Sequence, residues 1–168
     1  MALARAALFA RLDALSIAHR TVEHPPVFTV DEGRDLKATM PGGHSKNLFL
    51  KDKKDRLFLV VCHCDTAVDL VGYGRLAGAK GRFSFGKPDL MTATLGVVPG
   101  AVTPFALFNE SARLLTEVAV DAALMAFPEV WFHPLENTAS TGISPSDLIA
   151  FIRACGFEPR LIDLQNRG

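Results

Sequence analysis

The sequence predicts one α+β domain, residues 1–168, in which short helices surround a mixed, mostly antiparallel, twisted sheet. The length of 168 residues suffices for one compact core and is too short for two comfortable ones. Hydrophobic residues make up 49% of the chain, which is typical of a packed globular protein. Strand-like and helix-like segments follow one another without regular βαβ alternation, and this order favours the α+β class.

The N-terminal half is expected to intermix helices and strands. Thr29 and Glu32 are spaced as a capping box, which predicts a helix that ends near residue 38. Two apolar runs flank the charged turn of residues 52–55, and this pattern predicts a β-hairpin. The expected elements, in order, are a helix over 3–17, a strand over 19–24, the capped helix, hairpin strands over 46–51 and 56–63, a helix over 65–78 and a strand over 82–86.

The C-terminal half is expected to contain more strands. Asp89 follows Pro88 and is expected to cap a helix over 89–96. Ser144 precedes Pro145, which is typical of a helix start, and Gly156 is typical of a helix end. The other expected elements, in order, are a loop and then a strand within 97–109, a strand over 114–120, a helical turn over 121–127, a strand over 130–136 and a small polar cluster over 137–141.

Composition excludes several classes of protein. No apolar run approaches the length that spans a bilayer, and arginines lie within the amphipathic N-terminal pattern. We therefore expect a cytoplasmic protein without membrane contact. The three cysteines do not make a disulfide framework. Because Cys62 and Cys64 would face one side of a strand and His63 the other, we expect buried thiols and no bound metal.

Net charge and sequence motifs exclude further classes of protein. The formal net charge of zero argues against a protein that coats nucleic acid non-specifically. Residues 44–90, however, hold nine Lys or Arg against five Asp, which could guide a polyanion locally. Residues 72–77 fit the dinucleotide pattern G-x-G-x-x-A, but a helix is expected before them, where that motif requires a strand. No hydrolase elbow, zinc-protease or phosphate-loop motif is present.

Three polar segments at strand ends and loops remain as candidates for a site. They are His44–Asn47, the Gly100–Pro104 loop and the run from Phe132 to Thr141. Loops and strand ends are where functional residues concentrate. Taken singly, each segment also has an ordinary structural explanation. A lysine at a strand start is usually solvent-exposed, a Gly-to-Pro loop is usually only a turn, and a single histidine is usually packed or on the surface.

In this order, the segments resemble the YbaK/ProX family of trans-acting aminoacyl-tRNA editing proteins, relatives of the editing domain inserted in bacterial prolyl-tRNA synthetases. The resemblance covers nearly the whole chain, through residues 24–33, 42–61, 100–107 and 130–144. The family hallmarks, a lysine at a strand start and a G-x-x-x-P loop, match Lys46 and the loop that begins at Gly100. The Lys46–Asn47 pair and the "FHP" of residues 132–134 are similar to the branch that deacylates alanine wrongly attached to proline tRNA.

The resemblance implies a deacylase that needs no cofactor and no covalent nucleophile. Lys46 would hold a terminal phosphate or the ester carbonyl, amides of the loop at Gly100 would donate to the developing oxyanion, and His133 would position water or ribose. The vicinal hydroxyl of the substrate would assist proton transfer. The expected substrate-binding residues are Asn47, Val27, Phe28, Val30, Ala101, Thr103, Pro104 and Ser140. Val27, Phe28 and Val30 are equally compatible with ordinary core.

Two questions stay open at the level of sequence. Strict strand alternation would turn Lys46 and Asn47 to opposite faces, so both reach one site only if one of them precedes the regular strand. The second question is which function the protein has. A deacylase for cysteinyl-tRNA or prolyl-tRNA is one alternative to an alanyl-tRNA deacylase, and a nucleic-acid-binding module without catalysis is another. The expected partners are mischarged tRNA and, beyond it, prolyl-tRNA synthetase or an elongation factor.

Overall fold

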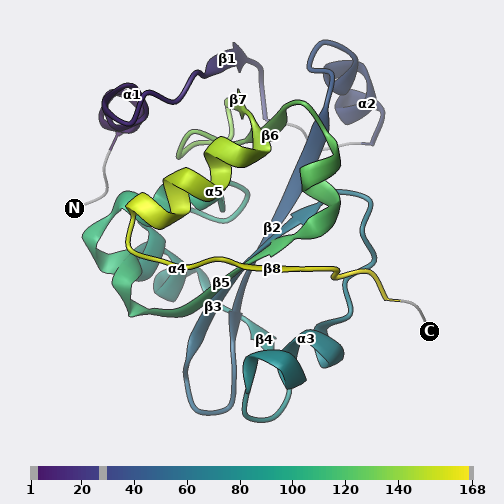
Figure 1. Ribbon diagram of the computed structural model, residues 1–168, viewed down its shortest axis with the longest axis vertical. Coiled ribbons are helices and arrows are strands. Elements are labelled where there is room, and N and C mark those ends of the chain that lie inside the picture. The colour runs from purple at the N-terminus through teal and green to yellow at the C-terminus, as the bar shows by residue number, and fades with distance from the viewer. Residues whose placement is uncertain (1–3, 27–29, 167–168) are drawn as a thin grey trace.

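The structure is a computed structural model that describes residues 4–26 and 30–166. Within these residues eight strands form one mixed sheet in the order β1-β7-β6-β2-β3-β5-β8, with β4 paired to β2 (Figure 1). Parallel pairing joins β2 to β6, β3 to β5 and β5 to β8, and the other pairs are antiparallel. The strands are β1 (Arg20–Glu23), β2 (Gly43–Lys51), β3 (Leu57–His63), β4 (Ser84–Phe85), β5 (Leu115–Asp121), β6 (Val130–Phe132), β7 (Ala139–Ile143) and β8 (Arg160–Ile162). The predicted α+β class is confirmed.

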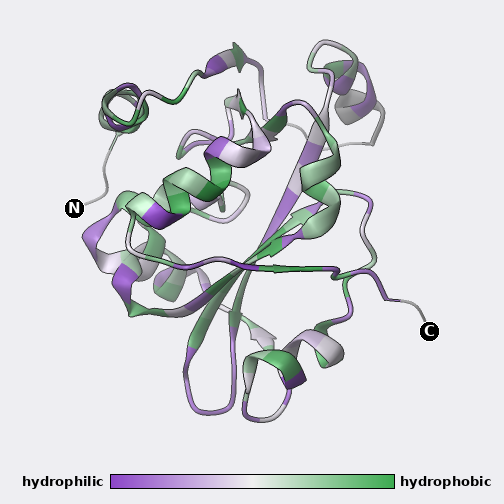
Figure 2. Cartoon of the chain, in the orientation of Figure 1, coloured by the Kyte–Doolittle hydropathy of each residue, from purple (hydrophilic) through white to green (hydrophobic). Residues whose placement is uncertain are grey.

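Helices cover both faces of the sheet unequally. The larger apolar cluster contains buried leucines of α1 and side chains of α4 and α5, whereas the smaller cluster is built on α3 through Tyr73. The helices are α1 (Arg5–Ala14), α2 (Val30–Ala38), α3 (Leu70–Ala77), α4 (Pro88–Leu95) and α5 (Pro145–Ala154). Hydrophobic colour concentrates on the central strands and on the inner side of α5 (Figure 2). None of the described helices is long and apolar enough to cross a bilayer.

Strand β2 separates the two clusters, and its side chains alternate between them. Phe49 belongs to the larger cluster, while Leu48 and Leu50 belong to or pack on the smaller one. Lys46 is paired with Cys62 of the smaller cluster, and Asn47 with Val61 of the larger one. Directly opposed residues share a face of the sheet. Lys46 and Asn47 therefore point to opposite faces, since regular strand geometry already includes both.

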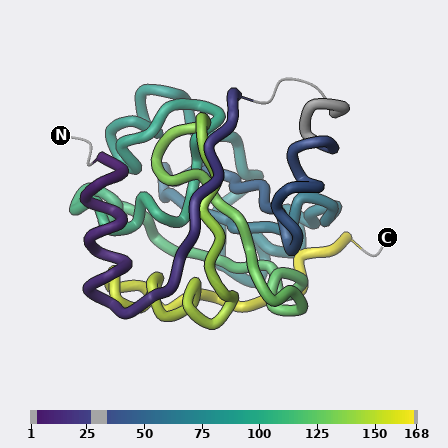
Figure 3. The backbone as a smooth tube through the Cα atoms, turned by 90° about the horizontal axis from the view of Figure 1, so that it is seen from above, coloured from purple at the N-terminus to yellow at the C-terminus, as the bar shows by residue number. Residues whose placement is uncertain are grey.

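The sheet opens where β2 and β6 part. These parallel strands pair only through Gly43 with Val130 and His44 with Trp131. One residue further along, the Ser45 hydroxyl donates to the carbonyl oxygen of Trp131 at 2.8 Å, which replaces the next backbone bond of the ladder. Beyond this point β2 continues toward the hairpin while the chain after β6 turns back into β7. On the far side β1 pairs with β7 (Figure 3). The split leaves room for a cavity between the strands.

A buried carboxylate, Asp52, fastens the other end of β2. Asp52 is 2% exposed and accepts hydrogen bonds from the backbone amides of Lys54, Arg56 and Lys80, at 2.9 to 3.0 Å, and from Arg56 Nε. Burial alone would raise its pKa, but these hydrogen bonds lower the pKa to about 2. The carboxylate thereby joins the β2–β3 turn to the loop after α3.

Three predicted details are wrong. The segment after the Gly100–Pro104 loop is a 3₁₀ helix, Pro104–Phe108, and not a strand, because Pro104 starts the turn and the Thr103 hydroxyl caps it. The polar cluster after residue 136 contains strand β7, which is buried between β1 and β6. Helix α4 begins at Pro88 with Lys87 as its N-cap, so Asp89 lies in the first turn. By contrast, the hairpin is confirmed, as is the helix capped by Ser144. Thr29 lies outside the described residues.

Candidate active site

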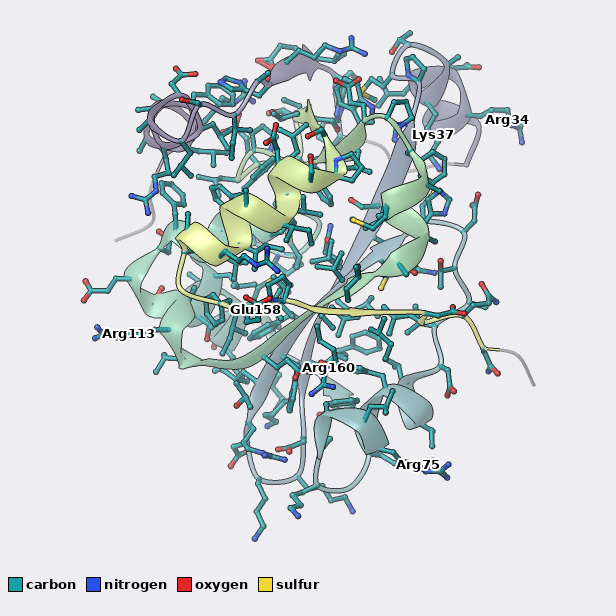
Figure 4. All side chains as sticks on the ribbon, viewed as in Figure 1. Arg34, Lys37, Arg75, Arg113, Glu158 and Arg160 are labelled. Carbon is teal, nitrogen blue, oxygen red and sulfur yellow. The ribbon has the colours of Figure 1, made fainter. Side chains whose placement is uncertain are left out.

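A cavity of about 220 Å³ lies at the split between β2 and β6, below α2. Its polar lining comes from five parts of the chain: His24 after β1, Lys37 on α2, His44, Ser45 and Asn47 on β2, Cys64 after β3, and His133 with Ser140 from the β6–β7 segment. Met40 and Trp131 supply apolar walls. Figure 4 shows Lys37 on α2 at the upper edge of the sheet, together with Arg34 of the same helix. The cavity is small beside those of drug-sized ligands, about 300–1,000 Å³.

Asn47 presents an unpaired acceptor at this cavity. The single proton of the Ser45 hydroxyl is donated to Trp131 O, so Ser45 can only accept from Asn47 Nδ2, which lies 3.3 Å away. This order fixes the amide orientation. Asn47 Oδ1 is then enclosed by protein without a partner among the described residues. A buried unpaired acceptor costs about 1–3 kcal/mol, so a ligand that displaces the atoms covering Oδ1 and brings an N–H or O–H donor would remove that cost.

His133 is held as a neutral imidazole with one free nitrogen. Its Nδ1 lies 2.8 Å from the carbonyl oxygen of Ala139, which can only accept, so Nδ1 carries the proton and Nε2 the lone pair. Burial lowers the pKa of His133 below its ordinary value of 6.5; the bond to Ala139 works in the opposite direction, and nearby His24 adds to the lowering.

The same pKa direction gives a testable pH dependence. Protonation of Nε2 would remove an acceptor from the cavity, and because the pKa is lowered, this occurs only below pH 6.5. We expect the enzymatic deacylation rate to stay constant from about pH 8 down to about pH 6.5 and to fall at lower pH. A pH–rate profile corrected for spontaneous ester hydrolysis measures this, and an acid midpoint above 6.5 would contradict it.

His24 and Ser140 form a buried pair beside His133. Each is 8% exposed. His24 Nδ1 lies 2.9 Å from the carbonyl oxygen of Pro25 and its Nε2 lies 2.9 Å from Ser140 Oγ. The rings of His24 and His133 are tilted by 55° with centroids 6.1 Å apart. Three polar groups of the cavity are thus locked by contacts within the protein.

The thiols are not nucleophiles at neutral pH. Burial raises the pKa of Cys62 to about 12 and that of Cys155 to about 11. Cys64 lines the cavity, and burial raises the pKa of its thiol although Lys37 Nζ lies 3.5 Å from Sγ. The donor atoms of His63, Cys64 and Asp65 lie within 4.8 Å of one another, but the Lys37 ammonium beside the thiol opposes a metal cation there.

Lys46 does not lie where it was predicted. It faces the α3 side of the sheet, its ammonium donates to the carbonyl oxygen of Thr66, and it is not among the residues that line the cavity. The facing of Lys46 and Asn47, which the sequence left open, follows from the regular alternation of β2 through both: the two side chains lie on opposite faces of the sheet. The cation at the cavity is Lys37, which the sequence did not single out.

The Gly100–Pro104 loop also lies apart from this cavity. The side chains of Ala101, Thr103 and Pro104 are buried in the core and none of them lines this cavity, so their part in substrate binding stays a prediction. The Ala101 amide is already donated to Val98 O. Gly100 itself is exposed with φ +90°, and a side chain there would meet only Asn137, 3.6 Å away. Its backbone therefore faces the turn that connects β6 to β7.

Other predicted residues have mixed outcomes. His133, Asn47 and Ser140 come together at the cavity, as expected of a shared site. Val27 and Phe28 lie outside the described residues, and Val30 begins α2. His24 and Lys37 were missed. A signal for His24 was present in the "HPP" sequence at residues 24–26, where proline fixes an extended chain end, but its partner Ser140 is 116 residues away.

Comparison with known proteins identifies the class. The sequence matches the family described as "Aminoacyl-tRNA editing domain" over residues 24–151. The chain therefore belongs to the aminoacyl-tRNA editing family that includes the YbaK/ProX proteins. The family match and the ProX relative together support prolyl-tRNA trans-editing as the class of function, with a deacylase-type activity.

Individual relatives cover nearly the whole chain. Mouse (Mus musculus) "Prolyl-tRNA synthetase associated domain-containing protein 1" is 37% identical over 163 residues, 95% of each chain. "Prolyl-tRNA editing protein ProX" of Acetoanaerobium sticklandii is 33% identical over 162 residues, 96% of this chain and 98% of that protein. The crystal structure of a proposed trans-editing enzyme for prolyl tRNA synthetase has a TM-score of 0.76 at 21% identity and covers 99% of both chains, which shows the shared fold.

Proposed function

We propose that the protein hydrolyses the ester between alanine and the terminal ribose of proline tRNA. The observation that carries the proposal is the cavity of about 220 Å³, which both Asn47, with its unpaired amide oxygen, and the neutral imidazole of His133 line. A space of this size suits a small aminoacyl group. Asn47 Oδ1 would accept a hydrogen bond from the amino group of alanine or from a ribose hydroxyl.

A physical need explains such an activity. A synthetase pocket shaped for proline rejects a smaller apolar amino acid weakly, because missing methylenes are worth only about 1–3 kcal/mol. A second and smaller site can hydrolyse the wrong ester while it excludes the larger, correct one. The ester is already activated, so a positioned water suffices, and the protonated thiols need not act.

Two predicted residues keep proposed roles outside the cavity. Lys46 is half-buried at the end of the sheet and its ammonium bonds to a neutral carbonyl, so an RNA phosphate would be a stronger partner than its present one. We assign it the 3′-terminal phosphate, approached from the α3 face of β2. Gly100 is proposed to offer its backbone to the substrate beside Asn137, since its exposed position allows close approach. Prolyl-tRNA synthetase or an elongation factor would deliver the tRNA.

The test compares three esters on one tRNA. Proline tRNA carrying alanine, cysteine or proline is incubated with the protein, and loss of each ester is followed over time. We expect alanyl ester to be lost at least about 10-fold faster than prolyl ester, the lower end of what a steric pocket achieves. Faster loss of cysteinyl ester would reassign the amino acid. Salt-sensitive binding without any ester loss would indicate a nucleic-acid-binding module instead.

A further inference from the structure

Backbone carbonyls decide which atoms of the cavity donate and which accept. Pro25 O accepts from His24 Nδ1, and Ala139 O accepts from His133 Nδ1. A carbonyl has no proton, so in its neutral form each imidazole carries its proton on Nδ1. Each Nε2 is therefore a lone-pair nitrogen. This tautomer does not depend on any choice of hydroxyl orientation.

The proton of Ser140 follows from that assignment. Its Oγ lies 2.9 Å from His24 Nε2, and a nitrogen without a proton can only accept. Ser140 thus donates its single proton to His24 and turns its oxygen lone pairs elsewhere. Because Ser140 and His133 both line the cavity, two acceptors belong to its lining, Ser140 Oγ and His133 Nε2.

We infer that these two acceptors hold the hydrolytic water, and that His24 is a positioning residue that keeps Ser140 an acceptor. The inference rests on the proposed function. A water molecule that donates one proton to Ser140 Oγ and the other to His133 Nε2 has its own lone pairs free on the opposite side. An ester carbonyl carbon placed there meets an oriented nucleophile, which lowers the entropy cost of attack. As the water oxygen bonds to that carbon, the water gives up one proton, the bond from the carbon to the ribose oxygen breaks, and the ribose oxygen takes up a proton to leave as a hydroxyl. If His24 were absent, the Ser140 proton could rotate into the cavity and compete with the water.

Substitutions separate this arrangement from a structural role. Ser140→Ala and His24→Ala are each expected to lower kcat for alanyl-tRNA about 10-fold or more with little change in KM. The double variant is expected to be no slower than the slower single variant, because both changes remove one interaction. His24→Gln supplies a carbonyl oxygen close to the place of Nε2, so it is expected to restore most of the rate. Ser84→Ala, at an exposed serine of β4, is the matched control.

Nitrogen-15 NMR of the histidine side chains tests the proton positions without any turnover. His24 and His133 are expected to show the neutral Nδ1–H form, and the His24 Nε2 shift is expected to move in Ser140→Ala. An Nε2–H form of His24, additive losses in the double variant, or full activity of Ser140→Ala would each overturn the inference while the deacylase function stands. A wild-type protein that hydrolyses no aminoacyl ester would instead overturn the proposed function itself.

Discussion

Replacing His133 with alanine should lower the rate constant for deacylation of alanyl-tRNA by about 100-fold. The substitution removes Nε2, a neutral acceptor whose tautomer is fixed by Ala139 O, and would leave the inferred hydrolytic water without one of its two partners. It also enlarges the cavity at the residue between β6 and the following turn. Single-turnover kinetics on proline tRNA charged with alanine measure the chemical step directly.

A histidine elsewhere in the chain provides the control. His19 lies near α1, where its Nε2 contacts Asp13 at 2.9 Å and its ring stacks on Phe9, and it does not line the cavity. His19→Ala should leave the rate of deacylation within about 2-fold of wild type. Equal rates for His133→Ala and wild type would show that His133 takes no part in deacylation. Circular dichroism of both variants shows whether a lower rate comes from unfolding or from the loss of the side chain at the site.

The largest expected effect on stability belongs to Asp52→Ala, which should cost about 2–4 kcal/mol of unfolding free energy. The carboxylate is 2% exposed and accepts from three backbone amides as well as from Arg56. Its removal leaves those amides and the guanidinium without their acceptor. The loop after α3 then loses one of its bonds to the β2–β3 turn, whereas the bond from the Lys53 amide to the carbonyl oxygen of Lys80 remains. Urea unfolding of wild type and variant measures the difference.

The dependence of this effect on pH is fixed by the low pKa of Asp52. In the folded protein the pKa is about 2, below the ordinary value of 3.8. The ionised carboxylate therefore contributes stability that is fully present above about pH 4 and is lost as the pH falls toward 2. The difference between wild type and Asp52→Ala should shrink over that interval. Asp55→Asn, at an exposed residue of the same turn whose left-handed backbone (φ 61°) suits Asn as well as Asp, should change stability by no more than about 0.5 kcal/mol at any pH.

Elements defined by local patterns were predictable from the sequence. The Ser144 cap followed by Pro145, and the charged turn between two apolar runs, involve residues a few positions apart. Strand β7 was missed for the opposite reason. Its small polar residues are buried because β1 and β6 flank it, and Thr141 finds a hydroxyl partner in Thr21, 2.7 Å away. A local sequence pattern does not predict a polar strand that is buried only because two strands distant in sequence flank it.

The site was predictable only in part. His133, Asn47 and Ser140 carry recognisable polar side chains in the segments that resemble the family, and they do meet at one cavity. The position of Lys46 depends on whether β2 is regular at residues 46 and 47, which is decided by its pairing with β3. The role of Lys37 depends on how α2 lies over the strands. Both are properties of the assembled sheet rather than of a short window.

The strict alternation of β2 makes this strand sensitive to its length in a way that the loops are not. Inserting or deleting one residue between Gly43 and Asn47 would rotate every later side chain by half a turn, unless the pairing with β3 slipped to compensate. The amide would then lie among apolar residues of the α3 side, and Phe49 would lose its place opposite Leu59. Substitutions in β2 thus alter single contacts, whereas a frame change of one residue would exchange the cavity-facing and α3-facing sides of the strand together.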